Sequence, residues 1–358
     1  MFTKKTPYIT LLLALTLGTS VQAQVPEAST QLQIYGAVDI GIASSRINHT
    51  NRTTGLFNGS LENSFWGLKG TEDLGSGLQA FFQLESGFDT STGAHEDESS
   101  FFNYAAKLGL QHEAYGTLSL GRQNPVSQEF NAELDLAAWA DYGMGALLRN
   151  SDDYQVNNSF QYQSPQWNGW QVGVGYKAKD DHYRTDPEAQ PATLNTALRY
   201  ESGRFYAALS YDQQLSSHYG ERKAHAWQLG MKYAFEPVTL SAAWSRQKNG
   251  FVGGNGNYLT PFAQGGRIDS GYVAAAVPLS EQGELIAQWS LAKPNWRWSN
   301  NEKAKKAQVY SLGYLHDISA RTQLYTYGGY GKHTNPDQMI SLDNPNSSRL
   351  AVGLIHYF

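Results

Sequence analysis

Apolar and polar residues alternate along many short segments of this chain. From Trp227 to Phe235, large apolar residues occupy every second position, and polar or small residues lie between them. The same alternation recurs at 78–85, 170–177, 205–211 and 285–291. A period of two places alternate side chains on opposite faces of a β-strand. The pattern therefore predicts strands with one apolar face and one face of small and polar residues, too small and polar to build a packed core.

Tight-turn signals separate these segments. Seven of them recur roughly every 40 residues, from Asp73–Gly77 to Asp317–Ala320, a spacing that a soluble propeller also has. One apolar and one polar face over ~10 residues is instead typical of a membrane barrel. Seven turns joining eight hairpins predict sixteen strands, at about 32–43, 63–72, 78–88, 102–112, 116–122, 158–164, 170–178, 192–201, 204–213, 224–235, 238–247, 268–278, 283–292, 306–316, 320–331 and 348–358.

We therefore expect an all-β fold, a 16-stranded antiparallel transmembrane β-barrel. An even number of strands places both ends of the barrel on the same, periplasmic side. Sixteen to eighteen strands enclose an aqueous channel, whereas eight fill with side chains. The sequence thus predicts a pore.

Composition supports an exported chain. Of 358 residues, 41% are hydrophobic, 16% are charged and none is cysteine, so charged residues are scarcer than the ~25% of ordinary soluble domains. The apolar stretch Tyr8–Gly18 is too short for a spanning helix, which needs ~20 residues. It follows two lysines and precedes a small-residue cleavage site, as in a secretory signal. We expect a signal peptide at 1–23 and one barrel domain at 24–358; the net charge of −5 suggests no nucleic-acid partner.

Five stretches of the chain form a recognisable series: Gln33–Asp39, Trp66–Gly75, Phe82–Phe88, Leu118–Gln123 and Val352–Phe358. They resemble the Gram-negative general diffusion porins of the β-proteobacterial type, in order and over essentially the whole mature chain. The resemblance implies a homotrimer among the lipids of the bacterial outer membrane. It also implies passive diffusion of ions and small hydrophilic solutes, and a third loop folded into the lumen. The terminal Phe358 is implied to be read by the outer-membrane assembly machinery.

The chain departs from the pattern of this family in two places. Phe65 stands where the family often has a basic residue, and Ile355 and Tyr357 replace residues that are commonly basic. In the second loop, His95–Glu98 is acidic. By resemblance this loop latches onto a neighbouring subunit, where divalent cations could bridge its acids; a solvated loop tip is the alternative.

Independently of the resemblance, the longest interval between turns contains a loop at about 123–157. A connection of that length is functional or disordered, and the helical composition of Ala132–Trp139 argues for order. We expect this loop to fold inward and narrow the channel; a solvated surface loop is the alternative. Its acids, opposed by the single base Arg149, are Glu129, Glu133, Asp135, Asp141, Asp152 and Asp153.

Strand parity points five basic side chains of the wall inward: Lys69, Lys107, Lys177, Arg199 and Lys232. Loop acids that face wall bases would set a transverse field across a wet constriction and select ions by charge and size. We expect Lys69, Lys107 and Arg199 to take part. For each of them, a solvated lumen charge without a particular role is the alternative.

Arg122 conflicts with strict alternation, which places it on the lipid face with Leu118 and Leu120. An arginine costs ~2–4 kcal/mol near the midplane of the bilayer. Either it lies at the interface or Gly121 marks a bulge that turns the side chain inward. Because the long loop starts immediately afterwards, we favour the bulge and assign Arg122 to the constriction.

Two other classes of function compete with a general pore. An enzyme would need a nucleophile beside a base, or a metal cluster. The nine histidines are dispersed and neither His-Glu-x-x-His nor Gly-x-Ser-x-Gly occurs, so we expect no enzyme, cofactor or metal site. The other alternative is a substrate-specific outer-membrane channel with a solute-binding constriction. Its solute-binding track would use aromatic loop residues, namely Trp139, Tyr142, Trp296 and Trp298.

Overall fold

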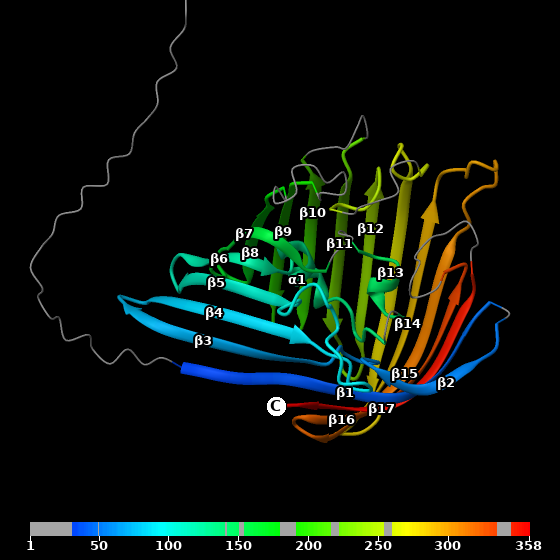
Figure 1. The fold of residues 1–358 in the computed structure, drawn as a ribbon, viewed down its shortest axis with the longest axis horizontal. Coiled ribbons are helices and arrows are strands. Elements are labelled where there is room, and N and C mark those ends of the chain that lie inside the picture. The colour runs from blue at the N-terminus through cyan, green and yellow to red at the C-terminus, as the bar shows by residue number, and fades with distance from the viewer. Residues whose placement is uncertain are drawn as a thin grey trace, which may run out of the picture.

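The computed structural model describes residues 31–48, 50–139, 142–149, 154–179, 191–215, 222–253, 260–334 and 345–358. Within them, seventeen strand segments form one closed antiparallel sheet (Figure 1). The segments are β1 (Gln31–Ile47), β2 (Thr53–Asn58), β3 (Phe65–Gly75), β4 (Leu78–Gly87), β5 (Ala105–His112), β6 (Gly116–Gln123), β7 (Val156–Gln163), β8 (Trp170–Lys177), β9 (Thr193–Ser202), β10 (Phe205–Gln214), β11 (His225–Ala234), β12 (Thr239–Lys248), β13 (Arg267–Pro278), β14 (Gly283–Pro294), β15 (Ala307–Ser319), β16 (Thr322–Lys332) and β17 (Ser347–Tyr357). The predicted signal peptide lies outside the described residues, and the predicted domain division stays a prediction.

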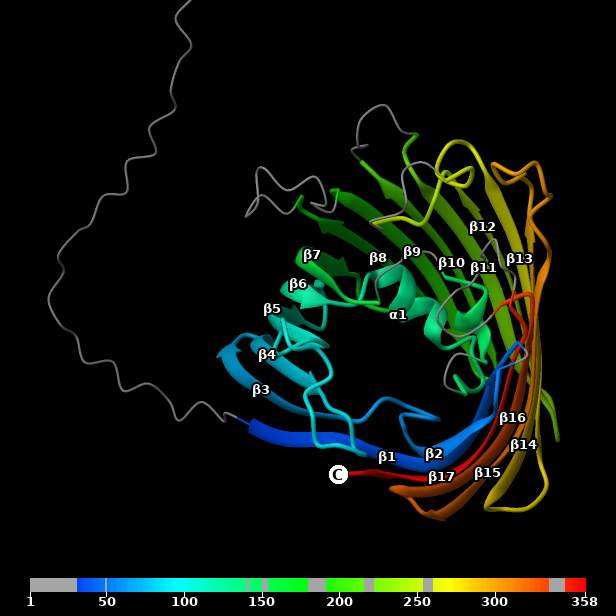
Figure 2. The same ribbon diagram turned by 45° about the vertical axis from the view of Figure 1, so that its right-hand side comes forward.

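The barrel closes between its first and last strands. From β3 onward each strand pairs with the next, and β1 pairs with β17 in the register Ala37 opposite Tyr357 (Figure 2). Phe358 and Gly36 exchange two backbone hydrogen bonds of 3.1 and 3.2 Å at this seam. No helix among the described residues is long and apolar enough to cross a membrane.

Seventeen segments occupy sixteen positions around the barrel. β2 pairs with the second half of β1, at Ile40–Ser45, and β3 pairs with the first half, at Gln31–Ala37. The two segments therefore share one strand position, and the prediction of a 16-stranded antiparallel barrel is confirmed. The sequence pattern did not predict β2, and it predicted that the first strand ends at residue 43. β1 instead runs on to Ile47, because β2 and β17 flank its second half.

The predicted division into two faces holds along β11. Trp227, Leu229 and Met231 are 42%, 46% and 54% exposed, whereas Gln228 between them is 2% exposed. The apolar set points out of the closed sheet, so the opposite face is the inner face of the barrel. The expectation that this inner face could not make a packed core was wrong, because large residues of the connection between β6 and β7 pack on it, among them Phe130.

Candidate pore constriction

The connection between β6 and β7 runs along the inner face of the barrel; we call its described residues 124–139 and 142–149 the β6–β7 segment. It contains α1 (Val126–Ala132) and the 3-10 helix η1 (Met144–Ala146). The helix precedes the predicted stretch Ala132–Trp139, which is mostly not helical. The physical reason lies in the wall, since the carbonyl oxygens of Leu134 and Ala137 accept hydrogen bonds from wall side chains instead of helical N–H groups.

Helix α1 is held by hydrogen bonds to β9 and β10, among them the following three. Ser127 Oγ donates to Asp212 Oδ1 at 2.7 Å, and Asn131 Nδ2 donates to Ser210 Oγ at 2.7 Å. The backbone N–H of Val126, at the start of the helix, donates to the side chain of a β9 asparagine at 3.0 Å. These groups are buried, so each bond satisfies a polar atom that would otherwise cost free energy.

Beyond the helix, polar side chains of successive strands bind the backbone of the segment. Ser241 Oγ of β12 donates to Leu134 O at 2.6 Å, and Gln288 Nε2 of β14 donates to Ala137 O at 2.7 Å. Ser311 Oγ of β15 donates to the carbonyl oxygen of Tyr142 at 2.9 Å. The small polar residues that alternation places on the inner face thus satisfy the backbone of a loop.

Glycines of the wall leave space for large side chains of this segment. Four pairs face each other in this way: Gly173 and Val126, Gly230 and Leu134, Gly313 and Trp139, and Gly329 and Tyr142. A methyl group on any of these glycines would overlap its partner. Trp139 is fully buried and stacks on Tyr327 of β16, with ring centres 5.1 Å apart. The segment and the wall are therefore complementary in shape.

Glu129 lies where α1 meets the wall. Its carboxylate accepts hydrogen bonds from Gln161, at 3.2 Å, and from Gln163. Burial raises the pKa of Glu129 above its ordinary range, and the positive charges of Lys107 and Arg199 oppose this shift. One predicted acid is thus brought within electrostatic reach of two predicted wall bases.

Glu133 and Asp135 have different environments. The side chain of Glu133 is 58% exposed, and its Oε2 lies 3.2 Å from Nζ of Lys232 on β11. Asp135 Oδ2 accepts from the backbone N–H of Met144 at 2.9 Å, and Tyr272 OH lies 3.3 Å from Oδ1. Burial raises the pKa of Asp135 to about 7. Three other predicted acids lie outside the described residues: Asp141, Asp152 and Asp153.

The remaining wall bases lie on the inner face at different places. Arg199 on β9 covers the ring of Phe130 at 4.7 Å and donates to Gln171 at 2.7 Å. Lys69 on β3 lies 4.5 Å from the ring centre of Tyr35 on β1. Lys177 is 1% exposed. Arg199 thus contacts the β6–β7 segment through Phe130.

The bulge predicted beside Arg122 is present. The register between β6 and β7 shifts between Gly121 and Gln123, and Gly121 has a φ of +124°. Arg122 Nε donates to Asn103 O at 2.6 Å, and Nη1 donates to Asn157 Oδ1 at 2.7 Å. These two bonds join the end of the second loop to β7, and the assignment of Arg122 to the constriction stays a prediction.

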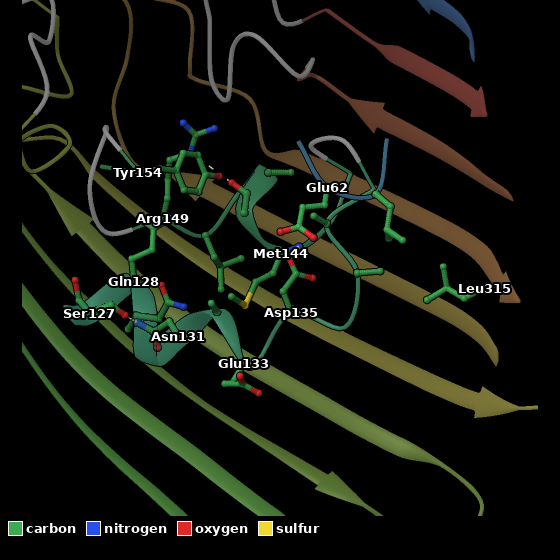
Figure 3. Close-up of a pocket in the computed structure, with 18 of the residues that line it drawn as sticks. Glu62, Ser127, Gln128, Asn131, Glu133, Asp135, Met144, Arg149, Tyr154 and Leu315 are labelled. Atoms are coloured by element: carbon green, nitrogen blue, oxygen red, sulfur yellow. Dashed lines mark hydrogen bonds between the residues drawn. The ribbon is translucent and has the colours of Figure 1, made fainter. Parts of the chain in front are cut away.

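A cavity of about 780 Å³ adjoins the segment (Figure 3). Glu133 and Arg149 line it from the segment, Tyr154 lines it from the residues just before β7, and Leu315 of β15 lines it from the wall. Glu62, from the connection between β2 and β3, also lines it. The sequence pattern predicts no role for Glu62, which lies just before the strand expected at 63–72. Among the described residues, no group of three or more histidines or acids is placed to hold a metal ion.

Comparison with known proteins agrees with this geometry. Residues 10–338 match the Gram-negative porin family. The chain belongs to this family. The porin is 31% identical to an outer membrane porin protein of Bordetella pertussis, over 94% of this chain and 96% of the relative. It is 27% identical to outer membrane porin protein 32 of Delftia acidovorans, over 83% of each chain.

Solved structures show the same barrel fold. The anion-selective porin from Comamonas acidovorans superposes on this porin with a TM-score of 0.73 at 23% identity, covering 92% of this chain and 100% of its own. OmpT of Vibrio cholerae, in a trimer form, gives 0.65 at 13% identity, covering 92% and 99%. The chain is therefore an outer-membrane porin and not an enzyme, and the alternative of a substrate-specific channel is not favoured.

Proposed function

We propose that the narrowest part of this passive diffusion channel lies between the β6–β7 segment and the opposite wall. The segment would then be the inward-folded third loop that the sequence predicts. The observation that carries the proposal is the series of hydrogen bonds from wall strands β9 to β15 onto the segment, beside a cavity of about 780 Å³. A loop held at so many points keeps a fixed aperture, which selects solutes by size.

Charges on the two sides of the aperture select among ions. On the segment, the proposed set is Glu129, Glu133, Asp135 and Asp141. On the wall, it is Lys69, Lys107 and Arg199, to which Lys232 is added by its contact with Glu133. Arg122 is included in this set only because of the bulge at Gly121, which is expected to turn its side chain inward. Unpaired charges dominate, because the opposite charges of an ion pair largely cancel each other's field at the permeating ion.

The porin is proposed to work as a homotrimer in the outer-membrane lipid, and Phe358 to be read by the assembly machinery. A trimer form of OmpT of Vibrio cholerae supports the oligomeric state. The second loop, at 88–104, is the proposed latch between subunits. Asp89 and Asp97 in this loop accept hydrogen bonds from Ser91 and Ser99, which hold the pKa of both carboxyls below their usual range.

Planar-bilayer recording of the purified full-length porin tests the channel and its trimer. We expect ohmic conductance in steps of three that rises linearly with salt concentration. Heat-denatured protein at the same concentration is the control. No conductance would overturn the proposal, single steps would overturn the trimer, and block by one particular solute would favour a specific channel.

Polymer exclusion tests the constriction. Poly(ethylene glycol) molecules of increasing size reduce conductance only while they can enter the pore. Leu134→Ala removes a buried contact of the segment, so larger polymers should enter this variant than enter the wild type. An unchanged size limit, in a variant that still conducts, would show that the segment does not set the aperture.

A further inference from the structure

The connection between β2 and β3 interrupts one strand position of the barrel. β2 ends at Asn58 and β3 begins at Phe65, yet both pair with the same strand, β1. The intervening residues 59–64, which we call the β2–β3 turn, therefore leave the sheet in the middle of the wall. Gly59, with a φ of +70°, starts the departure, because that conformation strains other residues.

A buried carboxylate fixes this turn on the inner face. Asp39 of β1 is fully buried, and its Oδ2 accepts the backbone N–H groups of Leu61 at 2.7 Å and Glu62 at 3.0 Å. Its Oδ1 accepts from Tyr325 OH at 2.5 Å. Ser64 Oγ bonds to both the N–H and the carbonyl oxygen of Asp39. Hydrogen bonds to a charged acceptor are about twice as strong as neutral ones, so the turn has a defined shape.

The same turn holds a carboxylate in the cavity beside the β6–β7 segment. Glu62 lines that cavity (Figure 3), and Tyr357 OH donates to its Oε2 at 2.9 Å. A hydroxyl donor is uncharged, so it orients the carboxylate of Glu62 without neutralising its negative charge.

The charges lining the cavity favour cations. Among the described residues that line it, the acids are Glu62, Glu133 and Asp135, and the single base is Arg149. Glu133 is paired with a lysine and Asp135 is hydrogen-bonded to the segment itself. The carboxylates of Asp39 and Glu85 lie close enough to act on Glu62 through space, so its surroundings add negative potential.

We propose that the β2–β3 turn is a second constriction element opposite the β6–β7 segment, and that Glu62 makes the pore prefer cations to anions. The inference rests on the proposed function, since it needs a conducting pore that narrows at this cavity. Asp39 is a positioning residue, because it acts by holding the turn, and Glu62 meets the permeating ions.

The main test is the reversal potential of the full-length porin under a tenfold KCl gradient. Glu62→Gln keeps the shape and the hydrogen bond from Tyr357 but removes one charge. For a charge a few ångströms from the ion in water, the cation-to-anion permeability ratio should fall roughly tenfold, because the loss of the charge weakens cation entry and eases anion entry. Glu113→Gln, at the exposed turn between β5 and β6, is the matched control and should leave the ratio unchanged.

A second test uses the absence of cysteine from the chain. Glu62→Cys carries one thiol, whose thiolate displaces methanesulfinate from a methanethiosulfonate reagent and forms a mixed disulfide. A cationic reagent should lower the conductance and shift the ratio towards anions, and an anionic reagent should shift it back. The same reagents on Glu113→Cys should change neither quantity.

The outcomes separate the two claims. If the wild type does not conduct, the proposed function fails. If the wild type conducts and Glu62→Gln leaves its reversal potential unchanged, the role of Glu62 is overturned. If Glu62→Cys is modified in full, as judged by mass spectrometry, without lower conductance, the turn is not a constriction element.

Discussion

The fit between Gly173 of β8 and Val126 of α1 offers the sharpest test of how the β6–β7 segment is held. Val126 is fully buried. A methyl on Gly173 would overlap the Cγ2 atom of Val126, and all three atoms nearest to that methyl belong to Val126. Gly173→Ala should therefore overpack this contact, Val126→Ala should leave a cavity, and the two changes together should relieve each other.

The magnitudes follow from burial. Gly173→Ala should cost about 1–3 kcal/mol, the usual range for overpacking. Val126→Ala removes two buried methyl groups and should cost about 2 kcal/mol. If the sites were independent, the double variant would lose about 3–5 kcal/mol. Because the added methyl fills space that the valine vacates, we expect the double variant to lose less than either single variant, a coupling of several kcal/mol.

Urea unfolding of detergent-refolded protein, followed by tryptophan fluorescence, measures these free energies. Gly271→Ala on β13 is the matched control, since nothing lies within 4 Å of the position its methyl would take; it should unfold at the wild-type midpoint. Single-channel current noise gives an independent measurement, because a loosened β6–β7 segment in either single variant should make the open-channel current fluctuate. A double variant that loses the sum of the two single losses would refute the packing argument.

Three further predictions concern charge. Burial raises the pKa of Asp135 to about 7, so the folded state holds this proton more tightly than the unfolded chain; the thermal midpoint should rise as the pH falls from 8 towards 5, more in the wild type than in Asp135→Asn. Lys232→Met and Glu133→Gln each break the ion pair at 3.2 Å and should shift the reversal potential in opposite directions, towards cations and anions respectively; shifts of the same sign would contradict the pairing. Arg122→Ala should shift it towards cations, and an unchanged potential would remove Arg122 from the constriction.

The alternation of residues was sufficient to predict the barrel. Lipid contact imposes large apolar side chains on one face of every strand, and closure requires pairing with the next strand, so the number and order of strands follow from the pattern and the turns. The sequence pattern did not predict one segment, β2, and the reason is local. Its six residues carry no clear alternation, and what makes it a strand is the second half of β1 beside it.

The candidate constriction was predictable in part. The excess of acids in the long loop and the parity of Lys107, Arg199 and Lys232 pointed to the contacts seen around Glu129 and Glu133. The glycine sites and the anchor at Asp39 were not predictable, because they depend on which inner-face residue meets which loop residue across the barrel. The helical composition of 133–139 led to a wrong expectation of helix there. Wall side chains donate hydrogen bonds to carbonyl oxygens that would accept helical N–H groups in a helix.

The four glycines that face large side chains of the β6–β7 segment have a consequence for protein engineering. Each side chain of the loop has its own site in the wall, on β8, β11, β15 or β16. A third loop transplanted from another porin would therefore meet the wrong sites unless the wall positions were exchanged with it. In this barrel, a redesign of the loop would therefore need matching changes at the glycine sites of the wall.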